Sequence, residues 1–213
     1  MPKPILYDYW RSSACYRVRI ALKLKNVDYE TRQVDLRQDE QKSGAYRELN
    51  PQGLVPMLEI DGHRLTQSLA IINYLDIRYA NHPLIPAAAA ERAQVVAMAL
   101  TVACDIHPLN NLRVLKYLKS ELGHDQAEVD RWYAHWVTEG LAALEAMAAP
   151  HAGAFLFGQA PTGADVCLVP QLYNARRFDV PLDAYPTLLR AEENANKLAG
   201  FADAHPDRQE VPA

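Results

Sequence analysis

The residues best suited to chemistry lie where a short apolar segment gives way to a helical pattern near the N-terminus. Ser12 and Ser13 stand at the predicted helix start, and Cys15 follows in the first turn. The positive end of a helix and neighbouring hydroxyl donors lower the pKa of a thiol. That thiol could be Cys15 itself or one supplied by a ligand, although Cys15 could also be a small, partly buried structural residue.

Two further segments contain backbone groups that could bind a ligand. Val55-Pro56 joins a predicted loop to a predicted strand, where a cis peptide bond would expose Val55 for pairing with an extended peptide. An ordinary trans proline is the alternative. Gln67 and Ser68 begin another predicted helix, whose first N–H groups and hydroxyl could bind a carboxylate or could act as a cap alone.

These segments belong to a pattern of alternating strands and helices. Asp61-Gly62 is a hairpin signal, and the order of elements predicts a four-stranded mixed sheet covered by helices. The predicted elements are a strand over 4–9, a helix over 12–25, a strand over 29–36, a short helix ending near Leu49, strands over 57–60 and 63–66, and a helix from Gln67. The first helix has an apolar face and an opposite charged face of Arg17, Arg19, Lys23 and Lys25.

After the prolines of a linker at 81–86, the pattern contains only helices. Thr162 and Asp165 form a capping-box pattern, which we interpret as structural. We therefore predict an α/β domain over residues 1–82 and an all-helical domain over 87–213, with a polar tail beyond Pro206 that should fray. The predicted helices cover roughly residues 88–122, 127–148, 163–177 and 187–205.

The composition indicates a soluble globular protein. Its 213 residues include 22 basic and 26 acidic side chains, and the net charge of -4 gives no reason to expect nucleic acid or an anionic membrane as a partner. A cytoplasmic protein is expected, because the three cysteines lack disulfide spacing and no signal peptide or long apolar segment is visible. Cys104 and His107 are too few ligands for zinc, so no metal is expected.

The segment from Arg11 to Leu22, RSSACYRVRIAL, resembles the SSCSxRVRIAL signature of the zeta-class glutathione transferases, the maleylacetoacetate isomerases. The resemblance extends from Pro4 to about Pro206. It implies the glutathione transferase fold, with a thioredoxin-like N-terminal domain that binds glutathione, a C-terminal helical bundle, and substrate bound between them. Further matching segments are NPQGLVPMLEIDG, QSLAIINYL, CDIHPLNNLRVLKYL and ADVCLVPQLYNARRF.

The resemblance also implies how glutathione would be bound. Val55 with cis Pro56 would pair with the cysteinyl backbone, and Gln67 and Ser68 would bind the γ-glutamyl carboxylate. Further residues implied to lie near the ligand are Gln41 at the glycyl end and His107 and Asn111 in the helical domain.

Ser12 would activate the glutathione thiol, assisted by Ser13 and the helix N-terminus. The family usually has Cys at the position of Ala14 and Ser at the position of Cys15. A direct chemical role of the family's cysteine therefore cannot be transferred, and Cys15 is kept only as a candidate beside the two serines.

The implied reaction is the glutathione-dependent isomerisation of maleylacetoacetate to fumarylacetoacetate in tyrosine and phenylalanine degradation. It proceeds by thiolate addition to the cis double bond, rotation and elimination. Arginines suit the substrate, a small maleyl dicarboxylate, because a guanidinium binds a carboxylate through two parallel hydrogen bonds. The candidates are Arg11, Arg113 and Arg177, whereas Arg17, Arg19 and Arg176 are expected on solvated faces.

Three other interpretations stay open. The substrate could be maleylpyruvate, which shares the maleyl group. The protein could be a thiol-disulfide reductase that forms a mixed disulfide at Cys15, or a glutathione-binding protein without catalysis. Glutathione transferase side activity and a homodimer are expected from the family alone.

Overall fold

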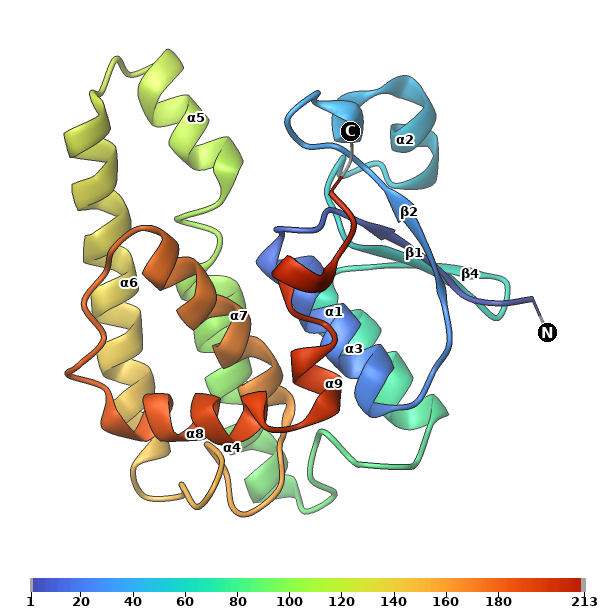
Figure 1. Ribbon diagram of the computed structural model, residues 1–213, viewed down its shortest axis with the longest axis vertical. Coiled ribbons are helices and arrows are strands. Elements are labelled where there is room, and N and C mark those ends of the chain that lie inside the picture. The colour runs from blue at the N-terminus through green and yellow to red at the C-terminus, as the bar shows by residue number, and fades with distance from the viewer. Residues whose placement is uncertain (1, 212–213) are drawn as a thin grey trace. The chain divides into compact units, whose positions relative to one another are not determined.

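Figure 1 shows a computed structural model of the chain, which describes residues 2–211. Packing divides the chain into two compact units, one made of residues up to Pro83 together with those from Asn196 onwards, and one made of Leu84–Ala195. The sequence predicts domains over 1–82 and 87–213. The division by packing differs in joining the C-terminal segment to the N-terminal unit.

The N-terminal unit is built around a four-stranded sheet with the order β2-β1-β3-β4. β1 pairs in parallel with β2 and antiparallel with β3, which also pairs antiparallel with β4. The hairpin between β3 and β4 turns through Asp61 (φ 50°) and Gly62 (φ 81°), so the predicted mixed sheet is confirmed. The strands are β1 (Ile5–Asp8), β2 (Glu30–Gln33), β3 (Met57–Ile60) and β4 (His63–Thr66).

Helices cover this sheet, and α1 and α3 lie side by side in Figure 1. One apolar cluster of the core contains Tyr7, Val34, Tyr46 and Met57. The helices of the unit are α1 (Ser13–Leu24), the 3-10 helix η1 (Glu40–Lys42), α2 (Gly44–Leu49), α3 (Ser68–Arg78), α9 (Ala199–Ala202) and the 3-10 helix η3 (Pro206–Arg208).

Of the four charged residues expected on a solvated face of the first helix, Lys23 is exposed, whereas the expectation is wrong for Arg17, Arg19 and Lys25. Arg17 and Arg19 are 1% and 0% exposed, and Lys25 after the helix is 2% exposed. Arg19 is neutralised by Asp8, with an N–O distance of 2.7 Å, and also donates to the carbonyl of Ala204 at 3.0 Å. The helical period could not reveal this, because a segment distant in sequence packs on the charged side of α1.

That segment is the C-terminal one, for which the sequence predicts a helix to about residue 205 and a frayed tail. Tyr16 donates from its hydroxyl to the carbonyl of Phe201 at 3.4 Å, and Phe201 is fully buried. A Cβ on Gly200 would lie 2.7 Å from the Leu24 side chain, so glycine permits the close approach. These contacts hold α9 against α1, and the helix predicted to continue to about residue 205 is divided into α8 and α9.

The second unit is built from helices. The single helix predicted over 88–122 is wrong, because the chain passes through a π-helix and a turn before the next helix begins. Pro108 lies in that turn and has no N–H to continue the helical bonds. The helices are α4 (Ala89–Leu100), the π-helix η2 (Thr101–Ile106), α5 (Leu112–Ser120), α6 (Gln126–Ala148), α7 (Gly163–Arg177) and α8 (Pro186–Asn196). Within residues 2–211, no helix combines the length and apolarity needed to span a membrane.

The predicted capping box at the start of α7 is confirmed. The Asp165 carboxylate accepts hydrogen bonds from the backbone N–H groups of Leu156 and Thr162 and from the Thr162 hydroxyl, at 2.8 to 2.9 Å. Burial outweighs these bonds and raises the pKa of Asp165 to about 6.

Candidate active site

The pairing of the sheet brings three predicted binding segments to one edge. Tyr7 of β1 lies opposite Met57 of β3, and Met57 lies opposite Thr66 of β4. The chain therefore leaves β1 towards α1, enters β3 from the Val55-Pro56 loop and leaves β4 towards α3 at the same edge. Segments that are far apart in sequence thus lie together.

Ser12 and Ser13 begin α1 in two different environments. Ser12 is the half-buried N-cap residue, and its Oγ accepts from the backbone N–H of Cys15 at 3.3 Å. Since the described contacts use this hydroxyl only as an acceptor, its O–H proton can be donated to a ligand. Ser13 is 3% exposed, and its Oγ has no hydrogen-bond partner within residues 2–211.

Cys15 is fully buried in α1. Burial and, to a smaller extent, the charge of Asp8 raise the pKa of its thiol well above the ordinary value, outweighing Arg19 and the Ser12 hydroxyl. This environment does not favour a nucleophilic Cys15. It favours the alternative in which the thiol belongs to a ligand.

The loop before β3 presents an open stretch of backbone. The Val55-Pro56 peptide bond is cis, as the resemblance implies. The carbonyl of Leu54 is fixed by the Tyr46 hydroxyl and by the side-chain amide of Asn50, both at 2.7 Å. The N–H and C=O of Val55 form no hydrogen bond within the described chain. An extended peptide could therefore pair with Val55.

Sequence reasoning missed the two residues that fix this loop, Tyr46 and Asn50. Asn50 is 1% exposed and accepts from the backbone N–H of Gln52 at 3.1 Å, a turn that an Asn before Pro could have signalled. Gly53 has a φ of 60°, and a Cβ there would lie 2.8 Å from the carbonyl oxygen of Gln41. Gln41 thus lies beside the loop, and its buried Oε1 has no partner among residues 2–211.

The start of α3 has no side-chain cap. Its N-cap residue, Gln67, has a φ of 68°, a strained value for a residue other than glycine, and its amide donates to Gln52 at 2.9 Å. Ser68 is 7% exposed, and its Oγ accepts from Nη1 of Arg17 at 3.3 Å. The first N–H groups of α3 therefore remain available to an anion.

The second unit contains His107, Asn111 and Arg113 around the break between η2 and α5. His107 is half-buried, and its backbone N–H donates to the carbonyl of Val102 at 2.9 Å. Asn111 is the N-cap of α5 and accepts from the backbone N–H of Arg113 at 3.1 Å, whereas the Arg113 side chain is exposed. The ligand contacts of these residues stay predictions.

α7 ends with two arginines in different states. Arg176, expected on a solvated face, forms a two-point ion pair with buried Glu192, with both N–O distances 2.5 Å. Arg177 is exposed, and its guanidinium lies 5.9 Å from the ring centre of Tyr173 and 5.7 Å from that of Phe178. Arg177 also donates from Nη1 to the Oδ1 of Asn174 at 3.3 Å, and its contact with a substrate carboxylate stays a prediction.

Arg11 precedes Ser12 directly, and its guanidinium lies 4.9 Å from the centre of the Trp10 ring. It is thus held close to the start of α1.

No group of three or more His, Cys, Asp or Glu side chains suited to a metal occurs within residues 2–211.

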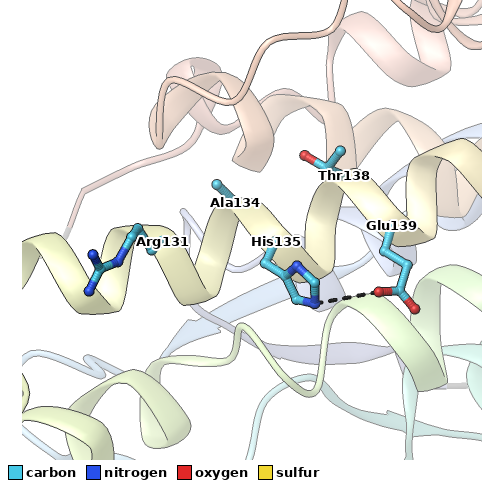
Figure 2. Close-up of a pocket in the computed structure, with 5 residues that line it drawn as sticks. All are labelled: Arg131, Ala134, His135, Thr138 and Glu139. Carbon is cyan, nitrogen blue, oxygen red and sulfur yellow. Dashed lines mark ion pairs between the residues drawn. The ribbon is translucent and has the colours of Figure 1, made fainter.

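A surface hollow of about 560 Å³ lies elsewhere, on α6. Figure 2 shows that its lining residues, which include Arg131, His135 and Glu139, all project from this one helix. His135 and Glu139 are 3.4 Å apart and more than 60% exposed, so they form an ordinary solvated pair. None of the predicted site residues lines this hollow.

Two family models match the chain. The model described as "Glutathione S-transferase, N-terminal domain" matches residues 2–77, and "Glutathione S-transferase, C-terminal domain" matches residues 126–199. Together with the mixed sheet of the first unit and the helices of the second, these matches define a protein of the glutathione transferase class.

Full-length relatives narrow this class. The chain is 50% identical over 208 residues to a probable maleylacetoacetate isomerase of Vibrio cholerae, with 96% of each chain covered. It is similar to the holo structure of a maleyl pyruvate isomerase described as a bacterial zeta-class glutathione S-transferase, with a TM-score of 0.95, 43% identity, and 98% of this chain and 100% of that chain covered.

A third comparison is with a maleylacetoacetate isomerase from Anaeromyxobacter dehalogenans with bound dicarboxyethyl glutathione and citrate in its active site. The TM-score is 0.89 at 44% identity, with 99% of this chain and 98% of that chain covered. The chain therefore belongs to the zeta class of the glutathione S-transferase family.

Proposed function

We propose that this protein catalyses the glutathione-dependent cis–trans isomerisation of maleylacetoacetate to fumarylacetoacetate. Full-length relatives named for this activity support the proposal. The observation that carries it is the convergence, at one sheet edge, of the Ser12 hydroxyl, the backbone of Val55 and the open start of α3. These are the groups that a tripeptide with a thiol requires.

The residues at this edge fit glutathione. Val55 pairs with the cysteinyl backbone through its N–H and C=O. Gln67, Ser68 and the first N–H groups of α3 bind the γ-glutamyl carboxylate. Gln41 contacts the glycyl end, a role supported by its position beside the Val55-Pro56 loop. Further proposed ligand contacts are those of His107 and Asn111.

Glutathione, when bound, supplies the thiolate that adds to the double bond, allows rotation and leaves by elimination. Ser12 stabilises the ionised sulfur by donating its O–H, while the Cys15 N–H fixes the hydroxyl oxygen from the other side. The N-terminus of α1 favours negative charge at the same place, and Ser13 is proposed to assist through its position in the first turn of this helix.

The proposed substrate residues are Arg11, Arg113 and Arg177. Each guanidinium can bind one carboxylate of a maleyl dicarboxylate at two points and so fix the position of the double bond. The dicarboxyethyl group and citrate bound in the Anaeromyxobacter relative support a site for a dicarboxylate. Arg176 is not included, because Glu192 already neutralises it.

The burial of Cys15 does not support the alternative function as a thiol-disulfide reductase. Attack on a disulfide requires an accessible thiolate, whereas Cys15 is fully buried and its pKa is raised. Maleylpyruvate remains a second candidate substrate, since the zeta-class structure named maleyl pyruvate isomerase is closely similar. Values of kcat/KM with both substrates would separate the two activities.

We further propose that the protein is a cytoplasmic homodimer. The dimer is proposed from the family resemblance alone, because a single exposed apolar side chain such as Ile77 on α3, at 75% exposure, is normal on a protein surface. Gel filtration at several protein concentrations tests the dimer, and a monomer throughout contradicts it.

The decisive experiment is an absorbance assay of cis-to-trans conversion of maleylacetone with and without glutathione. Conversion should require glutathione, because no side chain in the proposed site provides an ionised thiol. Equal rates without glutathione would contradict the proposed chemistry. Binding of glutathione without any turnover would instead indicate a binding protein that lacks catalysis.

A further inference from the structure

Arg17 is a buried cation in direct contact with the proposed glutathione site. It lies on α1 with 1% exposure, and its Nη1 is 3.3 Å from the Oγ of Ser68, a residue that is itself 7% exposed. A guanidinium can only donate hydrogen bonds, so Ser68 must accept in this contact. The O–H proton of Ser68 is therefore left to be donated elsewhere.

Arg19, two positions further along α1, shows what a purely structural arginine looks like. Its Nη1 lies 2.7 and 2.9 Å from the two carboxylate oxygens of Asp8, and its other donors bind the carbonyls of Trp10 and Ala204. These contacts hold Arg19 within the core of the unit. Arg17 is equally buried, and its Nη1 donates to the Ser68 hydroxyl, which belongs to the proposed glutathione site.

The start of α3 is already suited to an anion. It has no side-chain cap, and its backbone turns through Gln67 at a φ of 68°. A carboxylate bound by Ser68 and by the first N–H groups would lie close to the guanidinium of Arg17. In a site shielded from water, that charge stabilises the carboxylate more strongly than a surface charge would.

We propose that Arg17 is a positioning residue for glutathione. It holds and polarises the Ser68 hydroxyl so that this group donates to the γ-glutamyl carboxylate, and its buried charge favours the anionic form there. The role deepens the proposed function and rests on it, because it assumes that glutathione binds at α3.

The test measures binding by isothermal titration calorimetry on the full chain. The ligands are glutathione and an analogue that lacks only the γ-glutamyl α-carboxylate, γ-aminobutyryl-cysteinyl-glycine. Arg17→Gln should weaken the binding of glutathione about 10- to 100-fold, the range of a charge-assisted bond, and that of the analogue less than about threefold. Arg17→Lys, which keeps the charge, should recover part of the loss.

An equal loss for both ligands would show that Arg17 acts only through the fold and would overturn the proposal. If Arg17→Gln does not fold by circular dichroism, Arg17→Lys decides, since it keeps a buried charge on α1. It should still reduce the preference for glutathione over the analogue, because an ammonium group does not reproduce the contact of the guanidinium with Ser68, and an unchanged preference overturns the proposal. A wild-type protein that binds no glutathione contradicts the proposed function instead.

Discussion

The starts of α3 in the N-terminal unit and α7 in the helical unit differ in whether side chains of the chain itself cap the first N–H groups. α7 has a complete capping box, in which Thr162 and Asp165 bind each other and the backbone. α3 has no side-chain cap, and Gln67 adopts a strained backbone angle in front of it. A helix start that its own chain completes supports the fold, whereas one left open keeps the capacity to bind an anion.

The starts of α6 and α1 differ in the same way as those of α7 and α3. α6 in the helical unit has a second complete capping box, formed by Asp125 and Glu128. α1 in the N-terminal unit is capped by Ser12 alone, and the neighbouring Ser13 hydroxyl has no partner within the described residues. α6 and α7 are therefore closed at their starts by their own side chains, whereas the starts of α1 and α3 are partly open; α4, which follows Ala88, also has no side-chain cap.

Removing the closed cap of α7 should produce the largest effect. Asp165→Ala leaves two buried N–H groups and the Thr162 hydroxyl without their acceptor, so the free energy of unfolding should fall by about 3–5 kcal/mol. Urea unfolding measures it. Glutathione affinity of the folded variant should be unchanged, and a loss of affinity without a loss of stability would break the comparison.

A substitution at the start of α1 should lower the catalytic rate and not the stability. Ser12→Ala removes the proposed donor to the thiolate, and kcat should fall about 10²- to 10³-fold with little change in the midpoint of urea unfolding. Cys15→Ala is the matched control and should keep most of the isomerase activity. The reverse pattern, with Cys15 essential and Ser12 dispensable, would overturn the assignment.

The contribution of Asp165 in the α7 capping box to the free energy of unfolding should also depend on pH. The folded-state pKa of Asp165 is about 6, above its usual value in an unfolded chain, so the folded state binds the extra proton first. Protonated Asp165 therefore makes its full contribution to the free energy of unfolding at low pH. This contribution is lost as pH rises through about 6, and the loss is at most about 3 kcal/mol.

The non-titrating Asp165→Asn variant provides the reference for this measurement. The difference in unfolding free energy between wild type and variant should shrink from about pH 4.5 to pH 7. A difference that grows with pH would show that the three hydrogen bonds to the carboxylate outweigh its burial.

The smallest effect is expected at the exposed cap of α6. Asp125→Ala should lower the free energy of unfolding by about 1 kcal/mol, because water can replace the lost acceptor. Thermal unfolding of Asp125→Ala and Asp165→Ala, measured side by side, compares the stability lost at an exposed cap with that lost at a buried cap. Equal losses in the two variants would show that burial does not decide the strength of these caps.

Local signals predicted much of the fold. The strands, the Asp61-Gly62 hairpin and the Thr162-Asp165 capping box depend on a few adjacent residues, and all are confirmed. The burial of Arg17 and Arg19 depends on packing with distant segments, including Ala204, which lies 185 positions after Arg19. Periodicity within one helix carries no information about such contacts.

In the candidate site too, sequence alone marked residues at helix starts but not residues that act through contacts with distant segments. Ser12 and Ser68 lie at helix starts, where sequence alone marks them as capping or binding residues. Tyr46, Asn50 and Arg17 act on other candidate segments through side-chain contacts that depend on the folded loop and on the packing of α1 against α3. Tyr46 and Arg17 gave no local sign of these roles, whereas Asn50 before Pro51 could have indicated a turn.

The packing of the C-terminal segment on α1 has a consequence for the order of events during protein synthesis. Arg19 and Tyr16 obtain carbonyl acceptors from Ala204 and Phe201, each 185 positions later. Domains usually fold as units in the order in which they leave the ribosome. Here the unit translated first cannot close its interior until residue 204 has emerged, so the helical unit can reach its native packing before it.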